Sequence, residues 1–246
     1  MKGGTDVSRK DERDYLYLIW KEPISRRNYI VAQLSKNSQY EFSYGYEVEQ
    51  AIKVGFELLI PFDDIHKVYK SDTLFPTFSS RLPDSKRRGI ERILEKYDLK
   101  EFDEYKLLKR SGARLPIDSL EFIDPIFEEH NGEIKRIFHI AGVRHYIGCN
   151  GDNCEKSIHL SVGDRLSLEL ESTNEYDINA IKIMYKDNEH VGYLPRYYSE
   201  SVTEYLKDGA TYECKVVGIN KDMDCHECIK IKLEIYIDVK QMKKIS

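Results

Sequence analysis

The second half of the chain consists of short apolar stretches separated by turn-forming clusters. The clusters include Val-Gly-Asp (162–164) and Asn-Lys-Asp-Met-Asp (220–224), which are typical of loops between β-strands. One longer segment, residues 196–209, has the pattern of a helix instead. Many short strands with one helix predict a small, curled β-barrel. The six predicted strands are residues 136–143, 165–171, 180–185, 190–195, 212–219 and 229–239.

The first half has a different pattern, in which strands are followed by helices. Its strand-like stretches are rich in aromatic and β-branched residues. Further on, Pro83 and Asp84 are a helix-start signal, and apolar residues then recur at helical spacing from Ile90 to Tyr97. A second, shorter helix is expected to stop near Gly112. The predicted strands are 14–20, 27–35 and 40–45, and the predicted helices are 83–99 and 102–113.

The change from strands followed by helices in the first half to mainly short strands in the second half predicts two domains. The segment 123–135 contains Pro125, acidic residues and an Asn-Gly pair, so we place the boundary there. We predict a flexible tail over 1–13, an α/β module over 14–127 and the β-barrel over 134–246. The predicted fold class is therefore α+β.

Charge and cysteine content restrict the function. The formal net charge is −5, and neither half is basic, because the residues up to 130 carry −2 and the others −3. Wide coating of duplex DNA is disfavoured, whereas a small site for a strand end is permitted. The chain has no membrane span and no export signal, and its five cysteines are an odd number. We therefore expect a cytoplasmic protein with reduced thiols and no membrane partner.

Residues 171–196, "ESTNEYDINAIKIMYKDNEHVGYLPR", form the most distinctive motif. With "IAGVRHY" before it and "YYSESVTEYLKDG" after it, this region resembles a HIRAN domain. HIRAN domains have an OB-like barrel and occur fused to helicases and nucleases, or alone. The resemblance implies binding of the 3′-hydroxyl end of single-stranded DNA.

The resemblance assigns a role to six residues. It implies that Arg144 on the first strand contacts phosphate and that the "NEYD" loop stacks on terminal bases and takes the end hydroxyl. His145 departs from the pattern, because an aromatic residue is usual at its position. The implied DNA-binding residues are Arg144, His145, Asn174, Tyr176, Asp177 and Tyr193.

The chemistry of these residue types suits that role. A carboxylate at Asp177 can accept the proton of a terminal hydroxyl and repels an internal phosphate. Tyr176 offers a stacking face worth roughly 1–3 kcal/mol per base, and Arg144 can pair with phosphate. The alternative is a purely structural loop, in which Asn174, Asp177 and Asn179 bond their own backbone and Tyr176 fills a gap.

Residues 15–124 resemble the N-terminal subdomain of HipA-type kinases. The resemblance rests on "TLFPTFSSRLPDSKRRGIERILEKY" and "FDEYKLLKRSGARLPIDSLEFI". In that family the subdomain packs on a kinase core or, as a separate protein, restrains the kinase. The chain has no Gly-rich phosphate loop and no catalytic-loop or Asp-Phe-Gly segment, and its histidines have no metalloprotease spacing. We expect a protein that is not an enzyme and needs no cofactor.

Two cysteine pairs allow a structural zinc ion. "CNGDNC" and "CHEC" lie in loops at strand ends, where tetrahedral zinc sites are often built. The alternative is that the thiols are unpaired. The candidate zinc ligands are Cys149, Cys154, Cys225 and Cys228.

Two hypotheses follow from these patterns. In the first, the barrel recognises single-stranded DNA ends and the HipA-like domain contacts a protein effector such as a kinase, helicase or nuclease. In the second, the chain is a toxin–antitoxin type regulator of a HipA-like kinase or another effector, and it does not bind DNA. A role in antiviral defence is consistent with both.

Overall fold

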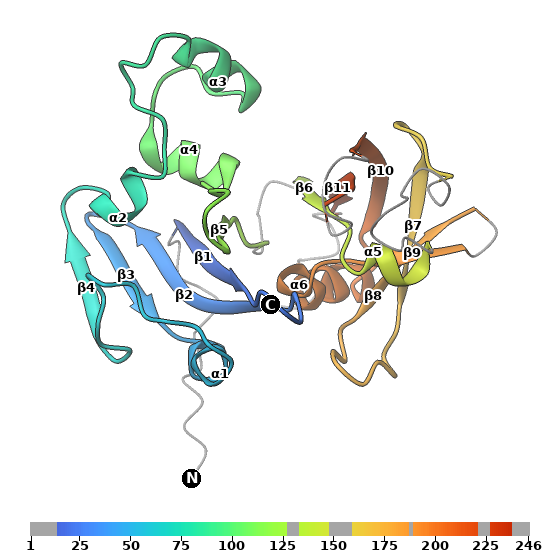
Figure 1. Cartoon of the computed structure of the whole chain (residues 1–246). Coiled ribbons are helices and arrows are strands. Elements are labelled where there is room, and N and C mark those ends of the chain that lie inside the picture. Colours follow the sequence, from blue (N-terminus) through green and yellow to red (C-terminus); the bar gives the residue numbers. More distant parts are fainter. Residues whose placement is uncertain (1–13, 127–132, 148–158, 187–188, 221–226, 238–246) are drawn as a thin grey trace. The chain divides into compact units, whose positions relative to one another are not determined.

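The computed structural model describes residues 14–126, 133–147, 159–186, 189–220 and 227–237. The chain divides between Pro125 and Ile126 into two compact units, each with one antiparallel sheet and short helices (Figure 1). The predicted α+β class is confirmed. The predicted tail, residues 1–13, lies outside the described residues.

The first unit is built on a five-stranded sheet in the order β4–β3–β2–β1–β5. Side chains of β3 alternate strictly, so that Tyr40, Phe42 and Tyr44 are buried while Glu41 and Ser43 are partly exposed. This alternation places one face of the sheet against a core. The strands are β1 (Asp14–Lys21), β2 (Asn28–Lys36), β3 (Tyr40–Tyr44), β4 (Val68–Ser71) and β5 (Leu120–Ile123).

The core of the first unit is a cluster of aromatic rings. Phe42 lies at its centre, with ring centroids 4.2 Å from Phe62 and 5.3 Å from Phe78. Phe78 in turn meets Phe122 of β5 at 5.0 Å. Tilted and edge-to-face pairs of this kind add to the stabilisation from burial. The cluster ties the loops on one side of the sheet to its strands.

The described part of this unit also contains four short helices. In α4 the Asp103 carboxylate accepts the backbone N–H of Lys106 at 2.9 Å, and Gly112 ends the helix in the left-handed conformation, as predicted. The helices are α1 (Val48–Lys53), α2 (Pro76–Ser79), α3 (Ile90–Lys96) and α4 (Glu104–Ser111).

The predicted helix 83–99 is too long at its start. Asp84 accepts the N–H of Lys86 at 2.7 Å, and Gly89 adopts a left-handed φ of 82° just before α3. The start signal therefore organises a turn, because a left-handed residue cannot continue a right-handed helix.

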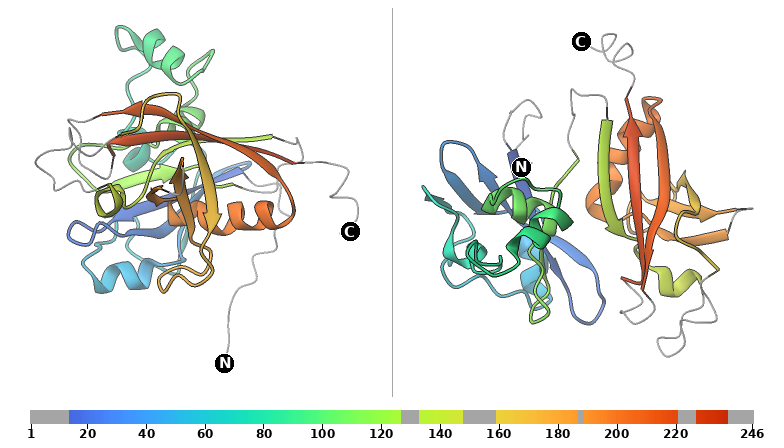
Figure 2. Two further views of the ribbon diagram at one scale, coloured as in Figure 1. Left: turned by 90° about the vertical axis from the view of Figure 1, so that its right-hand side faces the viewer. Right: turned by 90° about the horizontal axis from the view of Figure 1, so that it is seen from above.

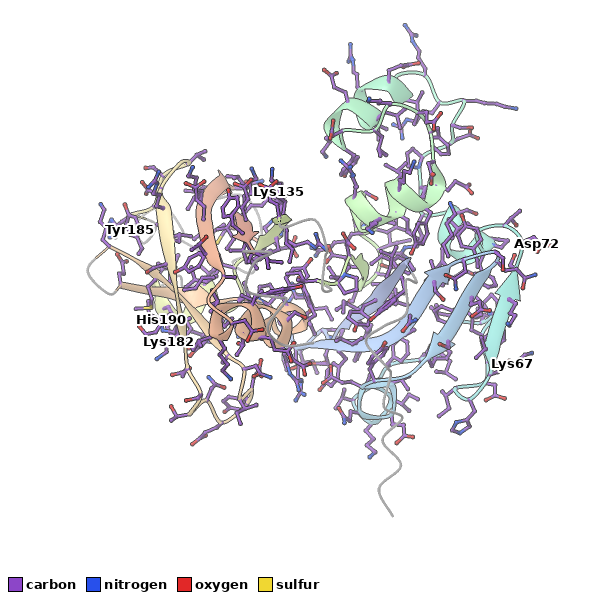
Figure 3. All side chains as sticks on the ribbon, turned by 180° about the vertical axis from the view of Figure 1, so that it is seen from behind. Lys67, Asp72, Lys135, Lys182, Tyr185 and His190 are labelled. Carbon is purple, nitrogen blue, oxygen red and sulfur yellow. The ribbon has the colours of Figure 1, made fainter. Side chains whose placement is uncertain are left out.

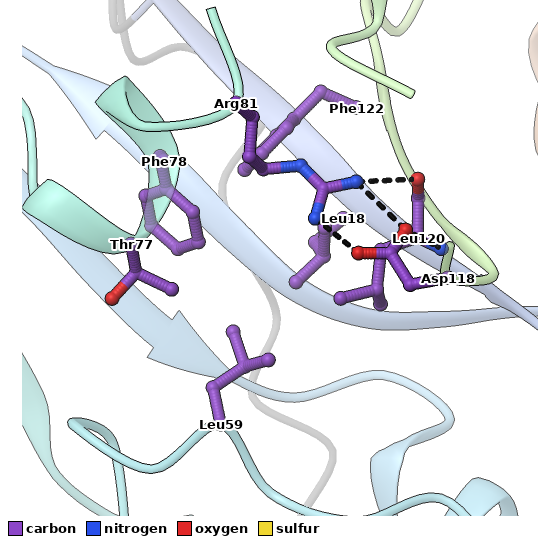
Figure 4. A pocket seen from close by; sticks show the side chains of 8 residues that line it. All are labelled: Leu18, Leu59, Thr77, Phe78, Arg81, Asp118, Leu120 and Phe122. Atoms are coloured by element: carbon purple, nitrogen blue, oxygen red, sulfur yellow. Dashed lines mark hydrogen bonds and ion pairs between the residues drawn. The ribbon is translucent and has the colours of Figure 1, made fainter. Parts of the chain in front are cut away.

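A cavity of about 200 Å³ lies between α2 and the start of β5 (Figure 4). Its walls are mainly apolar, with the Arg81 guanidinium paired to the Asp118 carboxylate at one side. Arg81 also donates to the carbonyls of Ala113 and Leu120, at 2.9 and 3.0 Å. The pairing with Arg81 overcomes partial burial and lowers the pKa of Asp118. Arg81 thus joins α2 to β5.

The second unit contains a six-stranded sheet in the order β6–β11–β10–β7–β8–β9. Helix α6 (Arg196–Lys207) packs on its inner face (Figure 2), where the rings of Tyr198 and Phe138 are 5.3 Å apart. The strands are β6 (Glu133–His139), β7 (Arg165–Leu170), β8 (Ile181–Tyr185), β9 (Glu189–Tyr193), β10 (Thr211–Ile219) and β11 (Ile229–Tyr236).

The predicted barrel is not closed in the described part of this unit. The edge strands β6 and β9 do not pair; only an isolated bridge joins Tyr193 of β9 to Ala141, just beyond β6. The chain leaves the sheet here because Gly142 has a left-handed φ of 72° and begins helix α5 (Val143–Tyr146). The predicted strand 136–143 is therefore too long.

Among the described residues, no helix has both the length and the apolar character needed to cross a membrane.

Candidate nucleic-acid interface

The loop between β7 and β8 is held by its own side chains. The Asn174 Oδ1 atom accepts the backbone N–H groups of Tyr176 and Asp177, at 2.9 and 3.1 Å. The Asp177 Oδ1 atom accepts the N–H of Asn179 at 2.9 Å. The Thr203 hydroxyl of α6 donates to the Asn179 carbonyl at 3.2 Å, which anchors the loop to the helix. These are the local turn bonds that such residues commonly form.

Two large apolar residues of this loop are exposed to solvent. The Tyr176 side chain is 87% exposed and Ile178 is 74% exposed. The purely structural alternative required Tyr176 to fill a gap in the protein, and its exposure shows that it does not. Asp177 uses one carboxylate oxygen for the turn, and its Oδ2 atom has no hydrogen-bond partner among the described residues. The loop thus presents an aromatic face and a carboxylate oxygen on a fixed backbone.

Glu171 connects the loop to the sheet. Its Oε2 atom accepts the Tyr193 hydroxyl at 2.7 Å and the Asn174 amide at 2.8 Å, and its Oε1 atom pairs with Lys182 at 2.7 Å. These three donors, with Lys182 the strongest, lower the pKa of Glu171 to about 2. The carboxylate is therefore charged at neutral pH, and the same pair raises the pKa of Lys182.

Three rings pack together beside this carboxylate. The Tyr146 ring lies 3.9 Å from His190 and 5.5 Å from Tyr193, and His190 and Tyr193 are 4.8 Å apart. Partial burial is the main cause that lowers the pKa of His190, with Lys182 nearby as a further cause (Figure 3). A lowered pKa favours the neutral imidazole, and its Nε2 atom lies 3.0 Å from the Gly192 carbonyl oxygen. Burial and the bond to Glu171 raise the pKa of Tyr193.

Arg144 and His145 lie on α5 and not on a strand, which corrects the sequence-based placement. Both are exposed, and the Arg144 Nε–H donates to the His145 Nε2 atom at 3.2 Å. Tyr146, on the same short helix, joins them to the ring cluster. The aromatic side chain beside β9 is thus supplied by Tyr146, one position after His145.

The glycine before Tyr193 at the end of β9, Gly192, is required by the local geometry. It has a φ of 146°, and a Cβ atom there would lie 2.6 Å from the Ala141 carbonyl oxygen. Only glycine tolerates both the conformation and the approach. Glycine thus leaves room for the Ala141–Tyr193 bridge, in which the two backbones exchange hydrogen bonds of 2.9 and 2.8 Å, and for α5 to lie against β9.

The predicted DNA-binding residues therefore belong to one connected region. Asn174 and Tyr193 share the Glu171 carboxylate, and Asn174 fixes the backbone of Tyr176 and Asp177. Arg144 and His145 reach the region through α5. Four members were not predicted from the sequence: Tyr146, Glu171, Lys182 and His190.

The zinc prediction falls mostly outside the described residues, which omit Cys149, Cys154 and Cys225. Cys228 is described and lies buried just before β11. Within the described ranges, no group of three or more His, Cys, Asp or Glu side chains could hold a metal ion.

Comparison with protein families agrees with the two resemblances. Residues 136–240 match the model of the HIRAN domain, and residues 24–116 match that of the HipA N-terminal domain. The chain carries a HipA N-terminal domain and a HIRAN domain. Neither match is to a kinase core. The HIRAN match contains all six predicted DNA-binding residues.

Solved structures that resemble the chain include HIRAN domains. A crystal structure of the HIRAN domain of human HLTF is 18% identical, covers 48% of this chain and 90% of that chain, and has a TM-score of 0.35. An NMR structure of the HLTF HIRAN domain in its DNA-bound conformation is also 18% identical, with 47% and 83% coverage and a TM-score of 0.31.

A crystal structure of a protein from Lactobacillus plantarum is 20% identical. It covers 42% of this chain and 97% of that chain, with a TM-score of 0.31. No curated protein matches the chain.

Proposed function

We propose that this protein binds the 3′ ends of single-stranded DNA through its HIRAN domain and catalyses no reaction. The observation that carries the proposal is the β7–β8 loop, where an exposed Tyr176 ring and an available Asp177 oxygen are held on a self-bonded backbone. A preformed loop loses little conformational entropy when it binds.

Each group has a chemical role in this proposal. The Asp177 Oδ2 atom accepts a hydrogen bond from the terminal 3′-hydroxyl group, and the carboxylate charge repels a phosphate in that position. The Tyr176 ring stacks on a base near the end. Arg144 pairs with a backbone phosphate. The ring of Tyr146 on α5 contacts the ring of Tyr193, and the Tyr193 hydroxyl donates to Glu171 beside the loop.

The HipA N-terminal domain is the second part of the proposal. We propose that it contacts a protein effector, because that is the role its family resemblance implies. The rival function is a toxin–antitoxin type regulator without DNA binding, and the net charge of −5 favours it. A role in antiviral defence is consistent with either function.

A competition experiment separates the two functions. A 5′-labelled oligothymidine with a free 3′-hydroxyl is bound to the protein and displaced with unlabelled strands, one linear and one circular, of equal length. We expect the linear strand to compete at least ten times better, because the circle has no end to offer Asp177. Equal competition would show binding to strand interiors, and no binding at low salt would leave the regulator as the function.

A further inference from the structure

Three cations stand directly opposite one another on neighbouring strands of the second unit. Lys215 of β10 is aligned with Lys232 of β11 on one side and with Arg165 of β7 on the other. Directly opposite residues lie on the same face of a sheet. We call Arg165, Lys215 and Lys232 the cationic row.

This arrangement is unfavourable for the sheet alone. Like charges directly opposite each other destabilise a pair of strands. Two glutamates next to the cationic row, Glu213 and Glu234, offset part of this repulsion. Glu213 pairs with Lys215 at 2.8 Å and with Arg165 at 3.5 Å. Glu234 pairs with Lys232 at 2.8 Å. Each acid thus serves more than one cation, because Glu234 also meets Lys135 at 3.4 Å.

Positive charge remains in excess on this face. Around the cationic row, the strands β6, β10 and β11 with Arg165 present five cations and three acids, a surplus of two positive charges on a chain of net charge −5. Figure 3 labels Lys135 in this part of the unit. At the end of the cationic row, opposite Lys232, Ile137 is 56% exposed. The cations are Lys135, Arg165, Lys215, Lys230 and Lys232, and the acids are Glu133, Glu213 and Glu234. Farther along β7 the same face adds Glu169 and Glu171, and Lys182 of β8 lies opposite Glu169, so this surplus falls to one toward the β7–β8 loop.

The cationic row lies on the same side of β7 as Glu171, the residue at which the β7–β8 loop begins. Side chains alternate along a strand, so Arg165, Ser167, Glu169 and the following Glu171 point to the same side of β7. Ladder pairs agree, because Glu169 lies opposite Lys182, which binds Glu171. Glu171 lies six residue steps after Arg165, or roughly 20 Å at about 3.3 Å per residue.

We propose that the cationic row binds backbone phosphates of the same DNA strand whose 3′ end occupies the β7–β8 loop. The inference rests on the proposed function, which supplies the polymer and fixes its end. A strand that spans roughly 20 Å needs about six nucleotides at the 3.4 Å stacked spacing. The proposed site is therefore longer than the β7–β8 loop alone, and its added affinity is electrostatic and depends on salt.

The test combines strand length with charge removal. The double variant Lys215→Gln/Lys232→Gln is compared with the wild type on 3′-hydroxyl oligothymidines of 3 to 12 nucleotides. We expect wild-type affinity to rise up to about six nucleotides and then level off. The variant should match the wild type on the shortest strand and lose at least fivefold on the longest. Its slope of log affinity against log salt should fall by about 1.4, at roughly 0.7 per phosphate contact.

Lys70→Gln is the matched control. Lys70 is another strand lysine in an ion pair, with Glu41 at 2.7 Å, but it belongs to the first unit. It should change neither the length dependence nor the salt slope. Melting curves show whether the double variant is folded, and Lys215→Arg/Lys232→Arg, which keeps both charges, should restore binding.

The outcomes separate this inference from the proposed function. A double variant with the wild-type salt slope and length dependence would overturn the inference, even if the protein still preferred strand ends. An equal loss on short and long strands would also overturn it. Equal binding of linear and circular strands would instead contradict the proposed end recognition, whatever the cationic row does.

Discussion

Replacement of Tyr176 by alanine is expected to weaken binding of a single strand by roughly 1–3 kcal/mol, which is about 5- to 150-fold. The loss follows from the removal of one stacking face, because the ring is 87% exposed and supports no core. The melting temperature should therefore stay unchanged. Fluorescence anisotropy with a short 3′-hydroxyl strand measures the affinity directly.

Tyr176→Phe is the control for this prediction. It keeps the aromatic face and removes only the hydroxyl group, so its affinity should stay close to that of the wild type. If Tyr176→Ala binds as well as the wild type, the ring does not stack on DNA. If Tyr176→Phe loses as much affinity as Tyr176→Ala, the hydroxyl and not the ring is responsible.

Phe42→Ala should destabilise the first unit by about 3–5 kcal/mol. Phe42 is fully buried and contacts Phe62 and Phe78, so its loss removes both burial and ring contacts at the centre of the core. For a unit of this size, about 3 kcal/mol lowers the melting temperature by roughly 12 °C or more.

The only tryptophan of the chain makes this test specific to one unit. Trp20 is buried in the first unit beside Tyr29 and Phe56, so its fluorescence reports the melting of that unit. Ile231→Ala, a large-to-small change in the buried part of β11, is the matched control. It should leave the tryptophan transition unchanged while circular dichroism shows a second, earlier transition. A single transition that moves in both variants would contradict independent folding of the units.

Strands and helix ends were predictable where local patterns decide them. β1, β2 and β3 were predicted from aromatic and β-branched runs, and α4 from its apolar spacing and Gly112. The start of α3 was not, because Pro83 and Asp84 are compatible with both a helix and a turn. The left-handed conformation of Gly89 makes this segment a turn.

Features that depend on distant contacts could not be predicted. The second sheet has an open edge because Gly142 turns the chain away from it. The apolar run 136–143 looks like a continuous strand, so the left-handed conformation of Gly142 could not be predicted from it. Nothing local shows that Gly192 approaches Ala141 closely enough to exclude a side chain.

Part of the candidate site was visible in the sequence. The "NEYD" loop stood out, because polar and aromatic residues gather there between two strands. Glu171 did not, because its three partners come from the loop, from β8 and from β9. The only available clue was its place three residues before Asn174, where a carboxylate can meet the amide across a turn.

The most direct measurement of the central claim is the ratio of affinities for two strands that differ only at the 3′ end. One ends in a hydroxyl group and the other in a phosphate, which adds about −1.5 to −2 charges near Asp177 at pH 7. Asp177→Asn removes the carboxylate charge but keeps an oxygen that can accept the Asn179 N–H, so the turn should persist. We predict that the wild type prefers the hydroxyl end at least tenfold and that Asp177→Asn loses this preference. Equal binding of both ends by the wild type, or an unchanged preference in Asp177→Asn, would contradict recognition of the 3′-hydroxyl by this loop.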